Sequence, residues 1–374
     1  MITLNTVFQR YGPAYRSQPP APITPAQRRA MTAIERCRTE ALGGQLFTCP
    51  TCHTTRYSYH SCRNRHCPTC QQDAGQAWLT TQQALLLPVP YFLVTFTVPA
   101  ELRAIARANQ RVVYTAMFRA SAAALQQLAH DPRHLGGTLG MLGILQTWTR
   151  DLRYHPHIHY LVPAVGFAAD GTVVFPPGTD FLLPVRPLAI LYRAKLQASL
   201  RQSPFAATIP AATWQQTWVV DCRPVGTGET ALKYLAPYVF RVALSNNRLL
   251  NADDDQITFR YRHSASGENR TSSVAAPAFI QRFLEHVLPS GFVKVRYYGL
   301  FSPRKRALLR RIRAQVMLFH GLDERPSGAG PPGGADHGQS IATCPACGTM
   351  MQRQALRPAH ARSPPVARSV IASA

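Results

Sequence analysis

Acidic residues are scarce in this chain. Asp and Glu together number 18 among 374 residues, against 41 Lys and Arg, so the formal net charge is +23. A protein this basic attracts polyanions, and nucleic acid is its usual partner. The chain also has 14 tyrosines and 4 tryptophans, whose rings can stack on unpaired bases.

Three further features are missing from the sequence. It has no apolar run of about 18 residues that could span a bilayer, and no apolar secretory signal at its N-terminus. It also lacks the Gly-x4-Gly-Lys-Ser/Thr loop that would indicate a helicase. We therefore expect a cytoplasmic, DNA-associated protein with no membrane contact and no small-molecule substrate.

The nine cysteines occur largely in closely spaced pairs, which suits zinc in a reducing cytoplasm better than disulfides. Near the N-terminus, the pattern Cys-x2-Cys-x14-Cys-x2-Cys can close a tetrahedron of thiolates around zinc. The predicted zinc ligands are Cys49, Cys52, Cys67 and Cys70. Cys62, His66 and Cys37 lie close enough to replace a ligand, to complete a second site or simply to support the loop. A domain this small needs its metal to fold.

Two arginines project from the same cysteine-rich loop. Arg63 and Arg65 are candidates for contact with DNA phosphates. A last Cys-x2-Cys pair, Cys344 and Cys347, has no obvious partner and is a weak zinc signal. It interrupts a segment rich in Gly, Pro, Ala and Ser, which is expected to be disordered.

A histidine-rich stretch over residues 153–163 is the strongest catalytic candidate. Its β-branched and aromatic residues predict a strand. Side chains two apart share a strand face, so His157 and His159 would form two legs of a divalent-metal site. Pro156 argues against extending the strand back to His155. Gln146 ends the preceding predicted strand and is either a third ligand or a residue that orients the ligands.

A helix is predicted farther along the chain, with Tyr234 and Tyr238 four residues apart on one face. Pro237 lies between them and should kink the helix. A tyrosine pair at this spacing most often packs in a core, so its meaning depends on the histidine strand. Lys233 could offset phosphate charge near the first tyrosine, or be an ordinary solvated lysine.

The pairing of a His-hydrophobic-His strand with a Tyr-x3-Tyr helix resembles the HUH endonucleases. With both tyrosines present, it resembles the two-tyrosine rolling-circle transposases of the insertion sequence 91 family. The cysteine-rich segment is similar to the zinc-binding domain that precedes the nuclease in that family. The resemblance covers about residues 25–320. It implies an α+β fold with an antiparallel sheet and packed helices, preceded by a small zinc-binding domain.

The resemblance also implies an activity: cleavage and rejoining of single-stranded DNA at transposon ends. His157, His159 and Gln146 would bind Mg²⁺ or Mn²⁺, and a tyrosine would attack the scissile phosphate to leave a 5′-phosphotyrosine. A free tyrosine has a pKa of about 10 and is a poor nucleophile at neutral pH, so a cation on the phosphate would assist it. Tyr234 is preferred as the initiating residue because Lys233 adjoins it.

Two alternatives stay open. A plasmid relaxase or replication initiator would use the same chemistry for another task. A zinc-dependent DNA-binding regulator would keep the nuclease fold without its activity. Cleavage of single-stranded oligonucleotides separates the regulator from the enzymes.

Four domains are expected along the chain: a loosely ordered N-terminus (1–24), a zinc-binding DNA-recognition domain (25–80), a nuclease domain (85–320) and a mostly disordered tail (321–374). The nuclease domain closes with a basic helix that begins at Ser302-Pro303. Arg306, Arg310 and Arg313 share one face of that helix, and the net charge favours phosphate contact over a merely solvated face.

Overall fold

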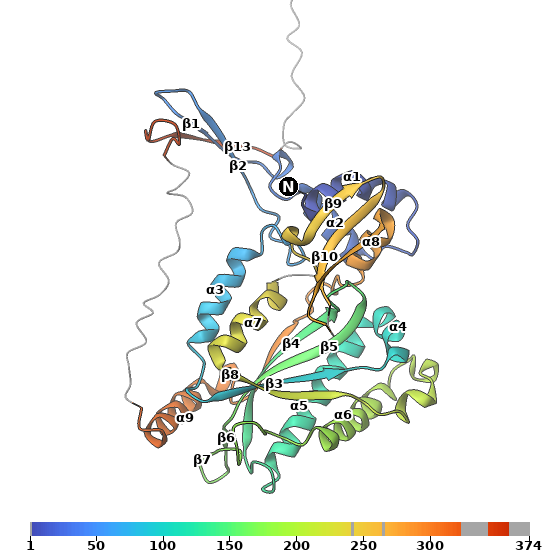
Figure 1. The fold of residues 1–374 in the computed structure, drawn as a ribbon, viewed down its shortest axis with the longest axis vertical. Helices are drawn as coiled ribbons and strands as arrows, with labels where there is room; N and C mark the ends of the chain where they lie inside the picture. The colour runs from blue at the N-terminus through green and yellow to red at the C-terminus, as the bar shows by residue number, and fades with distance from the viewer. Residues whose placement is uncertain (1, 241–242, 264–265, 323–342, 359–374) are drawn as a thin grey trace, which may run out of the picture.

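The computed structural model describes residues 2–240, 243–263, 266–322 and 343–358. Within its helices, the side chains at positions 72–74, 237, 238 and 240 are not described. Figure 1 shows three parts: a central domain built on the largest sheet, a helical unit beyond one end of that sheet, and a small ribbon of three strands. Antiparallel sheets with separate packed helices confirm the expected α+β class.

The central sheet is antiparallel, and its main strands lie in the order β12-β4-β5-β3-β8. Their bounds are β3 (Pro90–Thr97), β4 (Thr138–Trp148), β5 (Tyr154–Pro163), β8 (Val220–Thr227) and β12 (Val295–Gly299), with a short extension of β6 (Gly166–Phe167) and β7 (Val173–Val174). β4 and β5 are buried along almost their whole length, because helices cover both faces of the sheet.

Alternate residues of the inner strands point into two separate cores. One core includes Phe96, Ile158 and Tyr160. It is covered by the helices α4 (Ala100–Ala108), α5 (Gln110–His130) and α6 (Val185–Leu200). The opposite core includes Leu93 and Leu161. It is covered by α3 (Gln72–Gln83), α7 (Gly228–Phe240) and α9 (Arg306–Phe319). The period of two in β5 thus decides which helices each side chain meets.

The region 1–24, expected to be loosely ordered, contains the helix α1 (Leu4–Ser17). Its apolar positions recur at helical spacing and are buried against two helices, α2 (Pro25–Arg36) and α8 (Ala276–Leu284). The rings of Phe8 and Phe283 meet edge to face, with centroids 5.4 Å apart. The expectation of a loosely ordered segment was wrong because α1 packs on α2 and also on α8, which lies about 270 positions later in the chain.

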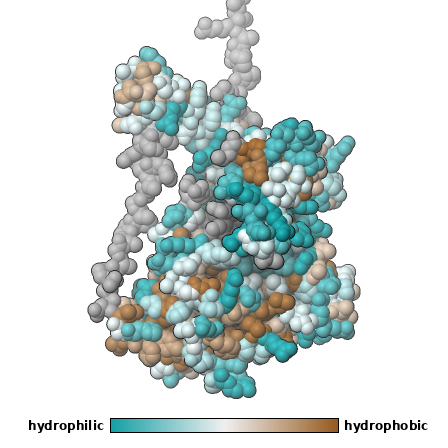
Figure 2. Space-filling model, viewed as in Figure 1, coloured by the Kyte–Doolittle hydropathy of each residue, from teal (hydrophilic) through white to brown (hydrophobic). Residues whose placement is uncertain are grey.

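The helical unit is completed by a second antiparallel sheet in the order β11-β10-β9. Its strands are β9 (Leu249–Asp253), β10 (Gln256–Arg262) and β11 (Asn269–Ala275). Thr24 and Gln27 form the capping box that starts α2, as the Thr-Pro sequence predicts. In Figure 2, hydrophilic residues dominate the visible surface of this unit, whereas hydrophobic residues gather over the central domain.

The ribbon pairs two strands from the first 60 residues of the chain with one strand from its C-terminal part. Its order is β13-β1-β2, from β1 (Gly44–Thr48), β2 (Thr55–Tyr59) and β13 (Gln352–Leu356). The sequence placed residues 343–358 in a disordered tail, but all five residues of β13 pair with β1. The rest of that predicted tail, from residue 323 to 342 and from 359 onward, lies outside the described residues.

Short 3-10 helices link these elements: Glu40–Leu42, Ala206–Thr208, Ala211–Trp214, Asn246–Arg248 and Pro303–Lys305. Residues 100–130 form two consecutive helices that are divided at Asn109, whose ψ of 42° interrupts the helical path between α4 and α5. Within the described residues, no helix has the length and apolar character needed to cross a membrane.

The three predicted phosphate-binding arginines of the basic helix α9 have different surroundings. Arg313 donates to the backbone carbonyls of Ala84 and Leu86, at 2.7 and 2.6 Å, just beyond the end of α3. The guanidinium of Arg306 lies over the ring of Tyr297, 5.8 Å from its centroid. Arg310 is exposed. Of the three predicted phosphate contacts, Arg310 is therefore the one presented to solvent, and Arg313 instead fastens α9 to α3.

We predict that Arg313→Ala lowers the free energy of unfolding by about 1–3 kcal/mol, because two carbonyls lose a charged donor. Arg310→Ala is the matched control on the same helix and should change it by less than about 0.5 kcal/mol. Urea unfolding followed by tryptophan fluorescence measures both. Equal losses in the two variants would contradict a structural role for Arg313.

Candidate functional site

The three histidines of β5 line one face of the central sheet. His157 and His159 are each only 8% exposed, and they alternate with Ile158, which is buried in the opposite core. Their ring centroids are 4.7 Å apart. In the register of the sheet, His157 is paired with Gln146 on β4. The face that carries them is the one covered by α7.

His155 also belongs to this strand, contrary to the expectation from Pro156. β5 begins at Tyr154, and the ring of His155 lies 5.2 Å from that of His157. The proline is tolerated because the pairing of β5 with β3 ends at His157 and its pairing with β4 is irregular here. No regular ladder on either side needs the missing N–H of Pro156.

Hydrogen bonds fix the orientation of the two buried imidazoles. Nδ1 of His157 lies 2.6 Å from the carbonyl oxygen of His155. A carbonyl can only accept, so Nδ1 carries the proton and Nε2 keeps its lone pair. Nδ1 of His159 is 3.0 Å from Oγ1 of Thr95. Burial lowers the pKa of His157 to about 4 and that of His159 well below its usual range. Both rings are therefore neutral at pH 7, as metal ligands must be.

Gln146 presents an oxygen to the same face. Its Nε2 donates to the carbonyl of Trp148 at 3.0 Å. Its Oε1 is buried and has no hydrogen-bond partner among the described atoms. A buried acceptor without a donor is costly unless another group satisfies it. Two neutral imidazoles and a carboxamide oxygen form a donor set that fits a divalent cation.

These side chains open into a cavity of about 650 Å³ beneath α7. Tyr234, which is 40% exposed, and Lys233 line it from the helix. Arg150 and Arg248 add positive charge to its wall. The guanidinium of Arg248 also donates to the backbone carbonyls of Arg150, Ala243 and Arg260, and so holds the loops that frame the cavity. Neither arginine was predicted from the sequence; the role of Arg248 depends on contacts with backbone carbonyls as far away in the chain as Arg150.

The second tyrosine is placed only by its backbone. Tyr238 and Pro237 both lie within α7, but their side chains are outside the described part of the chain. The kink expected at Pro237 therefore stays a prediction. The first tyrosine and the histidines, 70 or more positions apart in sequence, do line one cavity.

The cysteines form two clusters rather than the one predicted. The first contains Cys37, Cys62, Cys67 and Cys70, and the second contains Cys49, Cys52, Cys344 and Cys347. In each cluster the four sulfurs lie within 4.8 Å of one another. The predicted set of Cys49, Cys52, Cys67 and Cys70 was wrong because it joined two pairs that belong to different clusters, whereas Cys37 and Cys62, which the sequence left open for a second site, do complete the first cluster. Sequence spacing identifies the pairs, but the fold decides which pairs meet.

His66 is not among the potential metal ligands. Its Nε2 accepts the backbone N–H of Leu288 at 3.2 Å, and its Nδ1 lies 3.1 Å from Oδ1 of Asn64. Burial lowers the pKa of His66 to about 3. This neutral ring therefore ties the cysteine loop to the segment that precedes β12, which is the supporting role that the sequence left open.

The two arginines of the cysteine loop also differ. Arg63 is exposed and is available for contact with DNA. Arg65 is half-buried and donates to the backbone carbonyls of Pro289 and Phe292. Arg65 is therefore used inside the protein, and its predicted contact with phosphate finds no support in its position.

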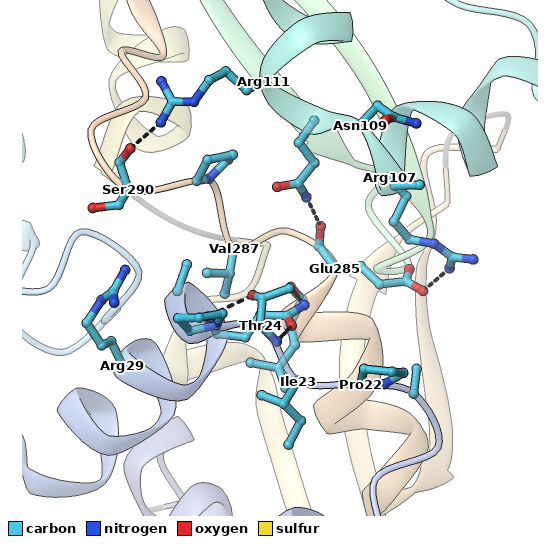
Figure 3. Close-up of a pocket in the computed structure, with 18 of the residues that line it drawn as sticks. Pro22, Ile23, Thr24, Arg29, Arg107, Asn109, Arg111, Glu285, Val287 and Ser290 are labelled. Atoms are coloured by element: carbon cyan, nitrogen blue, oxygen red, sulfur yellow. Dashed lines mark hydrogen bonds and ion pairs between the residues drawn. The ribbon is translucent and has the colours of Figure 1, made fainter. Parts of the chain in front are cut away.

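A second cavity, of about 640 Å³, lies where the helical unit meets α4 and α5 (Figure 3). Two of its three arginines are engaged by the protein itself: Arg107 forms an ion pair with Glu285, and Arg111 donates to the carbonyl of Ser290. None of the predicted catalytic residues lines this cavity. It is the junction between two parts of the fold.

Comparisons with known proteins define the class. The family described as "Putative transposase" matches residues 140–307, which include the histidine strand and the tyrosine helix. The family described as "Transposase zinc-binding domain" matches residues 7–98, which include the first cysteine cluster. Together these matches define the chain as a transposase with a zinc-binding domain.

Two curated relatives agree. The chain is 39% identical over 367 residues to "Putative transposase y4qJ" of Sinorhizobium fredii (strain NBRC 101917 / NGR234), covering 91% of this chain and 92% of that protein. It is 25% identical over 290 residues to "Transposase for insertion sequence element IS801" of Pseudomonas savastanoi pv. phaseolicola, covering 73% and 70%. No solved structure matches. The chain belongs to the insertion sequence 91 family of transposases, which confirms the resemblance.

Neutral buried histidines predict that the fold is sensitive to acid. Burial lowers the pKa of His155, His157 and His286 to about 4 in each case. The unfolded pKa is about 6.5, so the unfolded chain binds protons first as the pH falls. Their stabilising contribution is complete above about pH 6.5 and is lost toward pH 4. Each such group adds about 1.4 kcal/mol per pH unit to the slope.

His286→Gln isolates one of these groups away from the three histidines of β5. We predict that its free energy of unfolding depends less steeply on pH between about 6 and 4.5, by close to one proton. Urea unfolding at a series of pH values measures the slope for this variant and the parent chain. Identical slopes would show that His286 is not held neutral by burial.

Proposed function

We propose that this transposase cleaves and rejoins single-stranded DNA through a 5′-phosphotyrosine intermediate, as in rolling-circle transposition. The observation that carries the proposal is the meeting of Tyr234 with the histidine strand and Gln146 in one cavity. A nucleophile and a preorganised metal-binding face are the two parts that this chemistry needs.

The face would hold Mg²⁺ or Mn²⁺ through Nε2 of His157, a ring nitrogen of His159 and Oε1 of Gln146. The cation, when bound, would neutralise charge on a non-bridging oxygen of the scissile phosphate. The fit rests on the neutral imidazoles and on the buried Gln146 oxygen that lacks a donor among the described atoms.

The proposed reaction exchanges one phosphodiester for another. The hydroxyl oxygen of Tyr234 attacks phosphorus and gives up its proton to solvent. Its bond to phosphorus forms as the bond to the 3′ oxygen breaks, and the 3′ oxygen takes up a proton from solvent and leaves as a hydroxyl. The 5′ phosphate stays on the tyrosine. Because the phosphodiester energy is kept, attack by a 3′-hydroxyl can reverse the step without ATP.

The surroundings of the cavity suit a nucleic acid chain. Lys233, Arg150 and Arg248 place positive charge around it, in a chain whose net charge is +23. Tyr238, one helical turn after Tyr234, is proposed as the second nucleophile, which would permit a second cleavage before the first is resolved.

The transposase task is preferred over a relaxase or replication initiator because both curated relatives carry transposase names. The inactive regulator is disfavoured because a regulator has no need of buried, uncharged histidines beside an exposed tyrosine. Incubation of the purified protein with labelled single strands from its element's ends tests the proposal through covalent protein–DNA adducts.

We predict that His157→Ala and His159→Ala each reduce strand cleavage by at least about 10²-fold, since the lost ligand would act in the transition state. Binding of the same labelled strand, measured by fluorescence anisotropy in parallel, should change little. His130→Ala, at an exposed position, is the control. Undiminished cleavage by the double variant in a chelator would remove the metal from the proposal.

The tyrosines are tested by removal of single oxygens. Tyr234→Phe should abolish the first adduct, and Tyr238→Phe should leave it but block a later strand transfer. Each change removes only a hydroxyl, so packing is kept. Mass spectrometry of the trapped peptide decides: DNA attached to Tyr238 alone would reverse the assignment, and DNA on neither residue would end the mechanism. Tyr57→Phe, on the ribbon, is the matched control.

A further inference from the structure

The second cysteine cluster is assembled from the two ends of the chain. Cys49 and Cys52 lie in the turn between β1 and β2, whereas Cys344 and Cys347 precede β13. The zinc-binding family match ends at residue 98 and therefore includes only half of this cluster. Figure 1 shows β13 beside β1, at the opposite end of the molecule from α9, the helix that precedes it in sequence.

The two halves are copies of one local structure. They share the sequence Cys-Pro-x-Cys-x-Thr, at residues 49–54 and 344–349. In each half, the first cysteine donates its backbone N–H to the threonine carbonyl, at 2.9 Å for Cys49 and 2.8 Å for Cys344. The residue after the second cysteine has a positive φ in both, 57° at His53 and 73° at Gly348. The two turns thus share a sequence pattern, a backbone hydrogen bond and a positive φ at the same position.

The side-chain contacts repeat as well. The hydroxyl of Thr54 lies 3.1 Å from Sγ of Cys52, and the hydroxyl of Thr349 lies 3.4 Å from Sγ of Cys347. Once each cysteine is a thiolate, the form that binds metal, its sulfur has no proton and can only accept a hydrogen bond from the threonine hydroxyl. A second cysteine held by a threonine two residues later is thus a feature of both turns.

The distances between sulfurs suit a tetrahedral metal better than disulfides. Sγ of Cys49 is 3.4 Å from Sγ of Cys347, and Sγ of Cys52 is 3.4 Å from that of Cys344. Zinc–sulfur bonds of about 2.3 Å give an edge of about 3.8 Å between thiolates. A disulfide needs about 2.05 Å. The four sulfurs are therefore near the corners of a zinc tetrathiolate.

Little else stabilises the ribbon. Its buried cluster contains only four side chains, and two of them are ligands of the site: Phe47, Cys49, Cys344 and Met351. A core this small does not fold a three-stranded sheet by itself. The metal must supply most of the free energy that holds β13 on β1.

We propose that Cys49, Cys52, Cys344 and Cys347 bind a second structural zinc. This zinc holds the C-terminal segment 343–358, which includes β13, against β1 and β2. The first site, around Cys67, is more deeply buried, whereas Cys52 and Cys347 are exposed. The zinc bound by the second cluster is therefore the one that a chelator reaches first. The inference concerns the architecture of the chain and does not depend on the proposed cleavage chemistry.

The second zinc site is tested by native mass spectrometry of the whole chain, purified under reducing conditions. Two zinc ions per chain are expected. The variant C344S/C347S should hold one, while Cys222→Ser, which changes a cysteine outside both clusters, should hold two. One zinc in the parent chain, or two in C344S/C347S, would overturn the proposal. A denatured mass reduced by the hydrogens lost in disulfide formation would overturn it in favour of oxidation.

Hydrogen exchange and zinc release give independent readouts. Peptides that contain residues 352–356 should be protected in the parent chain and in Cys222→Ser, and should exchange at least about tenfold faster in C344S/C347S. Zinc released into a colorimetric chelator should show a fast and a slow phase, with the fast phase missing from C344S/C347S. Protection that survives in C344S/C347S would show that strand pairing, and not metal, holds the segment.

Discussion

The placement of β5 between β3 and β4 is the constraint on which the rest of the site depends. Two antiparallel ladders fix its register, so that His157 meets Gln146 across one ladder and His159 meets Thr95 across the other. A slip by one residue would turn the histidines into the core under α5 and α6 and bring Ile158 to the cavity. The apolar residues on both faces thus hold the polar ones in place.

The same burial that positions the histidines also prepares them for their proposed task. Removal from water lowers the pKa of His157 and His159, so no proton competes for the ring nitrogens at neutral pH. The Gln146 oxygen, buried without a donor among the described atoms, is destabilising for the metal-free fold. A structure that keeps such groups in its sheet carries a local cost, and a ligand that satisfies them removes it.

Local patterns were enough to predict the histidine strand, the flanking strands and the tyrosine helix, because a period of two or four residues fixes which side chains share a face. Long-range partners were not predictable in this way. Helix α1 packs partly on residues near Phe283, and the cysteine pairs were matched wrongly because Cys344 and Cys347, which complete the second cluster, come from the C-terminal part of the chain. The positive charge of an arginine also did not predict its partner. Arg65 and Arg313 have the sequence context of phosphate contacts, but their guanidinium groups bind backbone carbonyls.

The loop of the first cysteine cluster is connected by hydrogen bonds to the strand that carries Gln146. Arg65 and His66, from its loop, bind the segment 288–292 that leads into β12. The carbonyl of Lys294, at the start of that strand, accepts the backbone N–H of Leu145, the neighbour of Gln146. A change that unfolds the loop of the first cluster would therefore remove support from β4, the strand that carries the proposed ligand Gln146. Because of this path, a cysteine variant that fails to cleave DNA does not by itself assign a DNA-recognition role to the zinc-binding domain. Binding and cleavage have to be measured on the same variant before the two roles are separated.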